Sequence, residues 1–303
     1  YQIDEQVYPL VDMIRGDLFE EVEKLNRDGF RVLGIAYREF PSERTVFTVQ
    51  DESQLILLGY IAFFDPPKAT ANEAIGLLSE AGVTVKVLTG DNGPVTEKVC
   101  RDVGLRVDRM VTGAELARLS PEQFSDTVRE ANVFVKLSPS QKEEIVADLR
   151  RRGHVVGFLG DGINDAPALK TADVGISVDS AVDVAKEAAD IVLLEKSLLV
   201  LEEGIMEGRR VFANIVKYIR MGASSNFGNM FSVVGASYLL PFLPMQPVQI
   251  LANNLLYDVS QTGIPADTVD QELVAKPLKW NIGNIKRFMV VIGPISSVFD
   301  YAT

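Results

Sequence analysis

The sequence predicts an α/β domain with a parallel, doubly wound sheet, followed by a hairpin of two transmembrane helices and the start of a third. First, strand-like and helix-like segments alternate between Leu55 and Leu194, which is typical of a parallel sheet. Second, acidic and hydroxyl side chains follow several of the strand-like segments. Third, no Asp, Glu, Lys or Arg occurs between Met221 and Tyr257. About twenty apolar residues suffice for one helical crossing of a bilayer, so this stretch has room for two.

The alternating part predicts its elements in chain order. Apolar runs indicate strands, amphipathic runs indicate helices, and Gly or Pro residues separate them. Glu143 and Glu144 lie in the first turn of one such helix, where negative charge suits the helix dipole. We expect strands over residues 55–59, 83–88, 133–135, 155–159, 174–178 and 191–194, and helices over residues 69–80 and 141–152.

Composition narrows the class of protein. The length of 303 residues suggests about two domains. A formal net charge of -12 argues against a nucleic-acid partner. The single cysteine, Cys100, excludes an internal disulfide and fits a reducing compartment. No basic segment and apolar core follow Tyr1, so we expect no signal peptide, and we expect both ends to be truncated.

The most informative stretch runs from Gly160 to Asp165. It follows an apolar run that we interpret as a buried strand, and it holds Asp161, Asn164 and Asp165 beside two glycines. Ligands bind at the carboxyl ends of strands in open α/β sheets, and carboxylate oxygens suit Mg²⁺. An acidic turn without function is the alternative, and partner residues elsewhere in the chain make it the weaker one.

Two further side chains are expected at the same sheet edge. Thr89 follows the strand-like run that ends at Leu88, and Lys142 lies at the start of a helix. A hydroxyl, a lysine and two carboxylates suit phosphoryl transfer, in which a protein mainly positions groups and offsets charge. Taken alone, Thr89 has an ordinary turn as its alternative, and Lys142 has a solvated surface lysine as its alternative.

The uncharged stretch predicts crossings over about residues 221–240 and 248–266, joined by the proline-rich segment 241–247. Basic residues flank the pair on both outer sides, which places those flanks and the preceding domain in the cytoplasm. The flanking residues are Arg209, Arg210, Lys217 and Arg220, then Lys276, Lys279, Lys286 and Arg287. A third apolar run covers residues 288–299. A pair of buried core helices is the alternative.

Polar side chains interrupt this apolar region. Asn226 and Asn229 lie three residues apart, and Asn254 and Asp258 lie four apart, so each pair shares one helix face. An Asp at membrane depth costs about 2.5–3.5 kcal/mol and is a functional-site hypothesis by default. The oxygens of these four side chains indicate a binding site for a hard cation. Ser225, Tyr257 and Gln261 could also belong to that site. Alternatively, the asparagines only hold helices together.

These motifs resemble those of the P-type cation-transporting ATPases, whose phosphorylation domain has the haloacid-dehalogenase-like fold. The resemblance rests on Asp65 with two prolines, the Thr89-Gly90-Asp91 turn, Lys142 after Ser138-Pro139, and the stretch Gly160 to Asp165. The sequence around Asn226, Asn229, Asn254 and Asp258 is most similar to that of the bacterial magnesium-transporting branch. The resemblance implies four parts: the C-terminal part of a nucleotide-binding domain over residues 1–54, a phosphorylation domain over 55–200, a stalk helix over 201–220 and a transmembrane region over 221–303.

The resemblance also implies a role for each site residue. Asp161 and Asp165 would bind catalytic Mg²⁺, supported by Asn164. Thr89 would hold the phosphoryl oxygens, and Lys142 would offset their charge. ATP would contact Arg31, Asp65, Thr89, Gly90 and Asp91. The transported divalent cation would bind Asn226, Asn229, Asn254 and Asp258.

The departures from the family pattern are equally specific. The acceptor Asp of an Asp-Lys-Thr-Gly-Thr motif does not occur, so we expect the chain alone to be inactive. Asn229 stands where calcium pumps carry a carboxylate, which favours magnesium or a hydrated ion. We expect part of an ATP-driven Mg²⁺ pump of the bacterial inner membrane that works through a phospho-aspartate. A pump for another cation such as Ca²⁺, a haloacid-dehalogenase-like phosphatase and a non-enzymatic membrane-anchored remnant are the alternatives.

Overall fold

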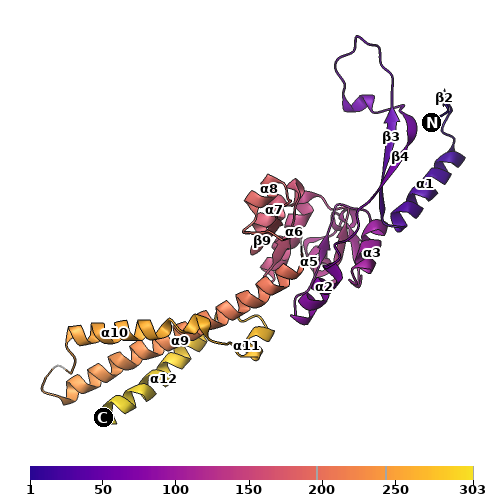
Figure 1. Ribbon diagram of the computed structural model, residues 1–303. Coiled ribbons are helices and arrows are strands. Elements are labelled where there is room, and N and C mark those ends of the chain that lie inside the picture. Colours follow the sequence, from indigo (N-terminus) through magenta and orange to yellow (C-terminus); the bar gives the residue numbers. More distant parts are fainter. Residues whose placement is uncertain (196, 243, 303) are drawn as a thin grey trace. The chain divides into compact units, whose positions relative to one another are not determined.

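The computed structural model describes residues 1–195, 197–242 and 244–302. The chain divides into two compact units. The first contains Tyr1–Ser79 and Val83–Val200, and the second contains Glu80–Gly82 and Leu201–Thr303. Figure 1 draws the first in indigo to magenta and the second mainly in orange and yellow.

An antiparallel hairpin dominates the first part of the first unit. After β1 (Gln2–Ile3), β2 (Gln6–Val7) and α1 (Asp12–Arg27), β3 (Phe30–Tyr37) pairs with β4 (Ile56–Phe64). The loop between these strands holds the short helix η1 (Val49–Asp51). The strand predicted over residues 55–59 therefore extends to Phe64, because the ladder with β3 continues as far as the pair Phe30–Phe64.

Parallel strands form the rest of the first unit, as predicted. One sheet has the order β5 (Val87–Leu88), β7 (Val133–Val135) and β6 (Met110–Thr112). The other has the order β10 (Ile191–Leu193), β9 (Val174–Val178) and β8 (Gly157–Leu159). All four pairings are parallel. The expected single sheet is thus two three-stranded sheets, because within the described residues β5 pairs only with β7 and β8 only with β9.

This one-sided pairing also corrects the prediction of a buried strand over residues 155–159. Val155 and Leu159 are exposed, and only Phe158 is buried. A strand with one unpaired edge leaves its backbone and flanking side chains to solvent.

Several helices of the first unit begin at a side-chain cap. Asn92, Ser120 and Ser138 each accept a hydrogen bond from the backbone N–H three residues later, and a proline follows within the first turn. The helices are α2 (Ala71–Glu80), α3 (Gly93–Asp102), α4 (Gly113–Leu116), α5 (Pro121–Glu130), α6 (Pro139–Arg151), η2 (Ile163–Asp165), α7 (Ala166–Thr171) and α8 (Asp183–Ala188).

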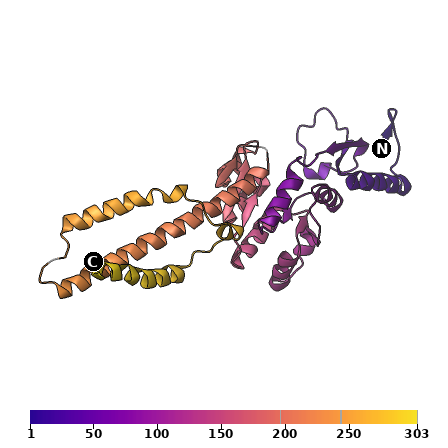
Figure 2. The ribbon, with the colours of Figure 1, turned by 60° about the horizontal axis from the view of Figure 1, so that its bottom comes forward.

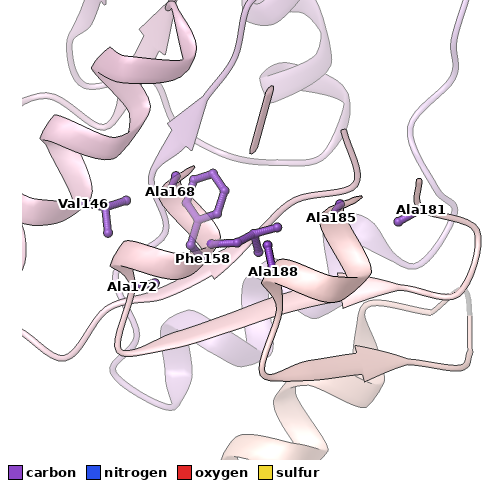
Figure 3. Packing of buried hydrophobic residues seen from close by; sticks show 8 residues of the cluster. Val146, Phe158, Ala168, Ala172, Ala181, Ala185 and Ala188 are labelled. Carbon is purple, nitrogen blue, oxygen red and sulfur yellow. The ribbon is translucent and has the colours of Figure 1, made fainter. Parts of the chain in front are cut away.

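Three apolar clusters bury the faces of the parallel sheets, and the smallest is formed by Cys100, Val133 and Val135. One surrounds Phe158 with small side chains from α7 and α8, so that those helices approach the sheet closely (Figure 3). Another surrounds Phe134 and Ile145. Leu88 of β5 packs against both the Phe158 and the Phe134 clusters, which places the carboxyl end of β5 near β8 although the two strands are not paired.

A long helix organises the second unit. α9 (Leu199–Leu239) has 41 residues without a break, so it is about 60 Å long at 1.5 Å per residue. After α10 (Pro247–Gln261), η3 (Ile264–Ala266) and α11 (Gln271–Ala275), the chain ends in α12 (Ile282–Ala302). Both views show α9 between α10 and α12 (Figures 1 and 2). The predicted stalk and first crossing are therefore parts of one helix.

No helix among the described residues combines the length and apolarity that crossing a bilayer requires. The structure therefore does not support the predicted transmembrane hairpin or third crossing. Serines and asparagines dilute the apolar character of α9, and α10 has 15 residues, fewer than the roughly twenty that span a bilayer. Residue 243 of the predicted connection and residue 303, at the end of the predicted transmembrane region, lie outside the described residues.

Candidate functional site

A tight loop at the end of β8 holds most of the predicted catalytic residues. A Cβ atom on Gly160 would lie 2.5 Å from Cβ of Asp165, so only glycine fits there. The Gly162 N–H donates to Oδ2 of Asp165 over 3.1 Å, and the buried Ser177 hydroxyl donates to the Gly160 carbonyl over 2.9 Å. These contacts fold the loop back on itself and fix the Asp165 side chain.

Lys142 and Asp165 form the central ion pair of this loop. The ammonium Nζ lies 2.7 Å from Oδ1 of Asp165, and each residue is 9% exposed. Lys142 reaches the loop from the first turn of α6, whose start is set by the Ser138 cap. A buried pair of this kind is costly to break, because either partner alone would be an uncompensated charge. The pair therefore holds one positive and one negative group at a defined place on the sheet edge.

Asp161 and Asn164 lie in the same loop but face solvent. Within the described residues the Asp161 carboxylate makes no hydrogen bond or ion pair, while its backbone carbonyl accepts from the Val182 N–H over 3.2 Å. Free carboxylate and amide oxygens fit a hard cation such as Mg²⁺. The described residues contain no cluster of three or more His, Cys, Asp or Glu side chains that could hold a metal ion. The loop thus offers part of a coordination shell.

The Thr89-Gly90-Asp91 turn forms a second polar group at the end of β5. The Thr89 hydroxyl donates to Oδ2 of Asp91 over 3.2 Å and accepts from the Asp91 N–H over 3.0 Å. Arg31 of β3 approaches the same carboxylate, with Nη2 at 2.5 Å from Oδ1. The structure therefore joins Arg31, Thr89 and Asp91, which were all predicted to contact ATP, although Arg31 is distant from the other two in sequence.

The two polar groups follow strands of different sheets that pack against the same apolar cluster. Thr89 directly follows Leu88, which packs against the Phe158 cluster from which the Gly160 loop emerges. No hydrogen bond in the described residues links Thr89 to Lys142 or Asp161. Asp65 is exposed in the segment after β4 and joins neither group.

Sequence reasoning missed Ser177, which supports the site, and Lys86, a partly buried lysine outside it. Ser177 was not singled out, although a serine inside an otherwise apolar strand could have signalled it. Lys86 was also missed, and its ammonium donates to the carbonyls of Val128, Arg129 and Ala131 at the end of α5. Burial lowers the pKa of Lys86, because desolvation disfavours its charged form.

A second candidate site lies in the helical unit. A cavity of about 200 Å³ opens between α9 and α10. It brings together Asn226, Asn254 and Asp258 of the predicted transport site, with Tyr257 and Gln261, which were expected to join it. Tyr218 and Gly222 complete the lining, whereas Asn229 does not reach it. Gln261 is buried, and its amide nitrogen has no hydrogen-bond partner in the described residues.

The comparisons with known proteins give a family for the first unit and relatives for nearly the whole chain. The sequence model of the haloacid dehalogenase-like hydrolases matches residues 6–173. A magnesium-transporting P-type ATPase of Escherichia coli K12 is 54% identical over 298 residues, which is 98% of this chain and 33% of that protein. A second one from Salmonella typhimurium is 50% identical over 301 residues. A calcium-transporting ATPase of Bacillus subtilis is 36% identical over 245 residues, or 80% of this chain.

The chain spans about a third of the length of its magnesium-transporting relatives. The match to the hydrolase family includes β3, β4, the Thr89 turn and the Lys142–Asp165 loop. The chain therefore belongs to the haloacid dehalogenase-like hydrolase family, and over nearly its whole length it is similar to magnesium-transporting P-type ATPases.

Proposed function

We propose that this chain is the part of an ATP-driven P-type pump that completes the phosphate site and binds the transported cation, and that the cation is Mg²⁺. The observation that carries the proposal is the buried Lys142–Asp165 pair beside the unengaged Asp161 carboxylate. Similarity to magnesium-transporting relatives supports the choice of ion.

We further propose that the acceptor Asp comes from a strand outside this chain that inserts between β5 and β8. Each of these strands has a hydrogen-bonded partner on one side only within the described residues. Leu88 touches the apolar clusters of both sheets, so both unpaired edges border the same core. A parallel strand there would bring its carboxyl end between Thr89 and the Gly160 loop, where strand ends bind ligands.

In this arrangement each side chain has one task. Thr89 donates its hydroxyl to an oxygen of the transferred phosphoryl group, and the Lys142 ammonium offsets the negative charge that grows on that group. Asp161 and Asn164 would hold Mg²⁺, which supplies further charge compensation when bound. Asp165 keeps Lys142 in place through their 2.7 Å contact. Arg31, held by Asp91, offers its guanidinium to ATP phosphates.

We also propose that the second unit resides in the bacterial inner membrane as part of such a pump. Asn226, Asn254 and Asp258 would contact the transported cation there, with Asn229 one turn further along α9. The uncharged stretch Met221–Tyr257 and the exposed leucines of α10 (Leu251, Leu255 and Leu256) support this. Membrane fractions of expressing cells, washed with alkaline carbonate, should retain the chain. Complete release by that wash would contradict the membrane assignment.

The test of the phosphate site is a chimaera in which this chain replaces the matching third of the Escherichia coli relative. Mg²⁺-stimulated ATP hydrolysis should survive the replacement. Asp161→Asn should abolish turnover of the phosphoenzyme, whereas Asp183→Asn, at an exposed carboxylate, should leave it unchanged. Normal turnover in Asp161→Asn would contradict the assigned role.

The transport site is tested in the same chimaera. Asp258→Asn should remove stimulation by the cation but keep phosphorylation of the acceptor, while Asp270→Asn serves as the matched control on an exposed carboxylate. Stimulation by Ca²⁺ in place of Mg²⁺ would contradict the assignment of the ion.

A further inference from the structure

We propose that Lys86 is a positioning residue for Thr89: its ammonium group anchors the start of β5 to the end of α5 and so sets where the Thr89 hydroxyl lies at the sheet edge. The inference rests on the proposed phosphate site and adds a residue on which that site depends. It is carried by the weak pairing of β5, the contacts of the ammonium group and the path of the backbone from α5 into β7.

The strand β5 is held by few hydrogen bonds. It has two residues and, within the described part of the chain, pairs only with β7. The Val87 N–H donates to the Asn132 carbonyl over 2.8 Å, and the Thr89 N–H donates to the Phe134 carbonyl over 3.0 Å. A slip of one residue along β7 would move Thr89 by about 3.3 Å and turn its side chain to the other face of the sheet.

Lys86 lies directly before β5 and supplies an anchor outside the ladder. Its ammonium group donates to the carbonyls of Val128 and Arg129 over 2.9 and 3.3 Å, and also to the carbonyl of Ala131. The last carbonyls of a helix have no partner within the helix and carry its negative partial charge, so they suit a cation. The three N–H donors of an ammonium group match three carbonyls.

The backbone that Lys86 binds leads straight into β7. Two residues, Ala131 and Asn132, separate the end of α5 from the start of β7. Lys86 binds the carbonyl of the first, and Val87 binds the carbonyl of the second. These two adjacent contacts fix the register of β5 against β7. Because Thr89 directly follows the same short strand, its place is fixed with that register.

The lysine occupies this place at a cost. Burial lowers the pKa of Lys86, because desolvation disfavours the charged form. The residues on either side of it, Val85 and Val87, are apolar. An unbranched apolar side chain such as that of Met would fill the place without desolvating a charge. Met cannot bind three carbonyls, so the contacts of the ammonium group are the reason for a lysine here.

The first test measures order at the Thr89 turn in the 303-residue chain and does not depend on pump activity. Lys86→Met keeps the length of the side chain and removes its hydrogen bonds. In hydrogen exchange followed by mass spectrometry, peptides containing Thr89 and Leu137 should exchange at least ten-fold faster, since the Leu137 N–H donates to the Thr89 carbonyl. Exchange in β9, which belongs to the other sheet, should stay unchanged.

Two further variants serve as controls. Lys98→Met, at a lysine of α3 whose ammonium group pairs with Asp102, should leave exchange at Thr89 unchanged. Lys86→Arg keeps the charge and the donors and should exchange within three-fold of the natural chain. Unchanged exchange at Thr89 in Lys86→Met would overturn the inference. Equal loss of protection throughout β9, or an Arg variant as fast as the Met variant, would also overturn it.

The second test links Lys86 to the chemistry through a double-mutant cycle in the chimaera. Lys86→Met should slow formation of the phosphoenzyme at least ten-fold when Thr89 is present. In the Thr89→Ala background the hydroxyl that Lys86 positions is gone, so the same change should slow formation less than two-fold. A general structural support would slow formation equally in both backgrounds, and that result would contradict the positioning role.

The outcome is separable from that of the proposed function. A chimaera that forms no phosphoenzyme, together with lost protection at Thr89 in Lys86→Met, would refute the function and support the anchoring of Thr89. An active chimaera in which Lys86→Met has equal effects in the two backgrounds would support the function and refute the positioning role.

Discussion

The two candidate sites are built in opposite ways. At the sheet edge, the buried Lys142–Asp165 pair and the Gly160 loop are held by hydrogen bonds and by the core beneath them. In the helical cavity, Asn226, Asn254 and Asp258 are exposed, and only Gln261 of the lining is buried. The first site thus keeps its geometry through packing, whereas the second depends on the spacing of two helices. Rigidity suits the phosphoryl group proposed for the first site, and looseness suits the entry and release of the ion proposed for the second.

The same contrast recurs on the two sides of α9. Towards α12, Gly228 and Gly293 let the backbones touch, and the buried Ser297 hydroxyl donates to the Gly228 carbonyl over 2.8 Å. Towards α10 lies the cavity. Since small residues allow close helix contact, α9 and α12 pack as a pair, and α10 is the helix whose movement would change the cavity.

The largest effect should follow from breaking the ion pair at the sheet edge. Lys142→Ala leaves the Asp165 charge buried without a partner, which costs about 3–5 kcal/mol. Hydrogen exchange measured by mass spectrometry should show lost protection in α6 and β8, with little change in α9. Lys170→Ala, at an exposed lysine on α7, is the control. A loss below about 1 kcal/mol would show that the pair is solvated as at a surface.

The second-largest effect on stability is expected from a change at the loop glycine, Gly160. In Gly160→Ala the new Cβ would overlap Asp165, and overpacking of this kind costs about 1–3 kcal/mol. The same change should also lower the phosphoenzyme turnover of the chimaera, because it distorts the loop that holds Asp161. Gly157→Ala on the preceding strand β8 places its Cβ at an ordinary 3.9 Å from Ile176 and should be tolerated. Equal behaviour of the two variants would mean that the loop is not rigid.

The helical unit offers a pair of changes with opposite signs. Gly228→Ala pushes a Cβ against the Gly293 carbonyl and should destabilise the helices by about 1–3 kcal/mol. Gly208→Ala meets nothing and should stabilise α9 by about 0.5–1 kcal/mol, because glycine is a poor helix former. Thermal unfolding followed by circular dichroism separates them. The same sign for both would remove the case for a packed α9–α12 pair.

The smallest effect on stability is expected for Arg31→Ala. The pair with Asp91 is exposed, so its loss should change the free energy of unfolding by less than about 1 kcal/mol. The KM of the chimaera for ATP should nevertheless rise several-fold, because the guanidinium is proposed to contact the phosphates. Rescue by Arg31→Lys would indicate that charge alone suffices, and an unchanged KM in Arg31→Ala would exclude the contact.

Sequence patterns predicted the bounds of the central strands well. The strands over residues 133–135 and 174–178 have the expected bounds, because both are short apolar runs paired on two sides. Helices α3 and α5 were not predicted, although Asn92 and Ser120, each soon followed by proline, signal their starts. Strand β4 ran past its predicted end because β3 continues beside it.

The sequence by itself determined that glycines and carboxylates gather in the Gly160–Asp165 loop, because an apolar strand ends directly before them. It also determined that polar groups share faces of two helices, since that follows from helical spacing alone. Only the tertiary structure decided that Lys142 pairs with Asp165, that Arg31 reaches Asp91, and that Asn229 stays outside the cavity. It likewise decided that α9 runs unbroken and that no described helix meets the requirements of a membrane crossing. The physical reason is that partners distant in sequence, and the space left between elements, depend on packing that no local pattern encodes.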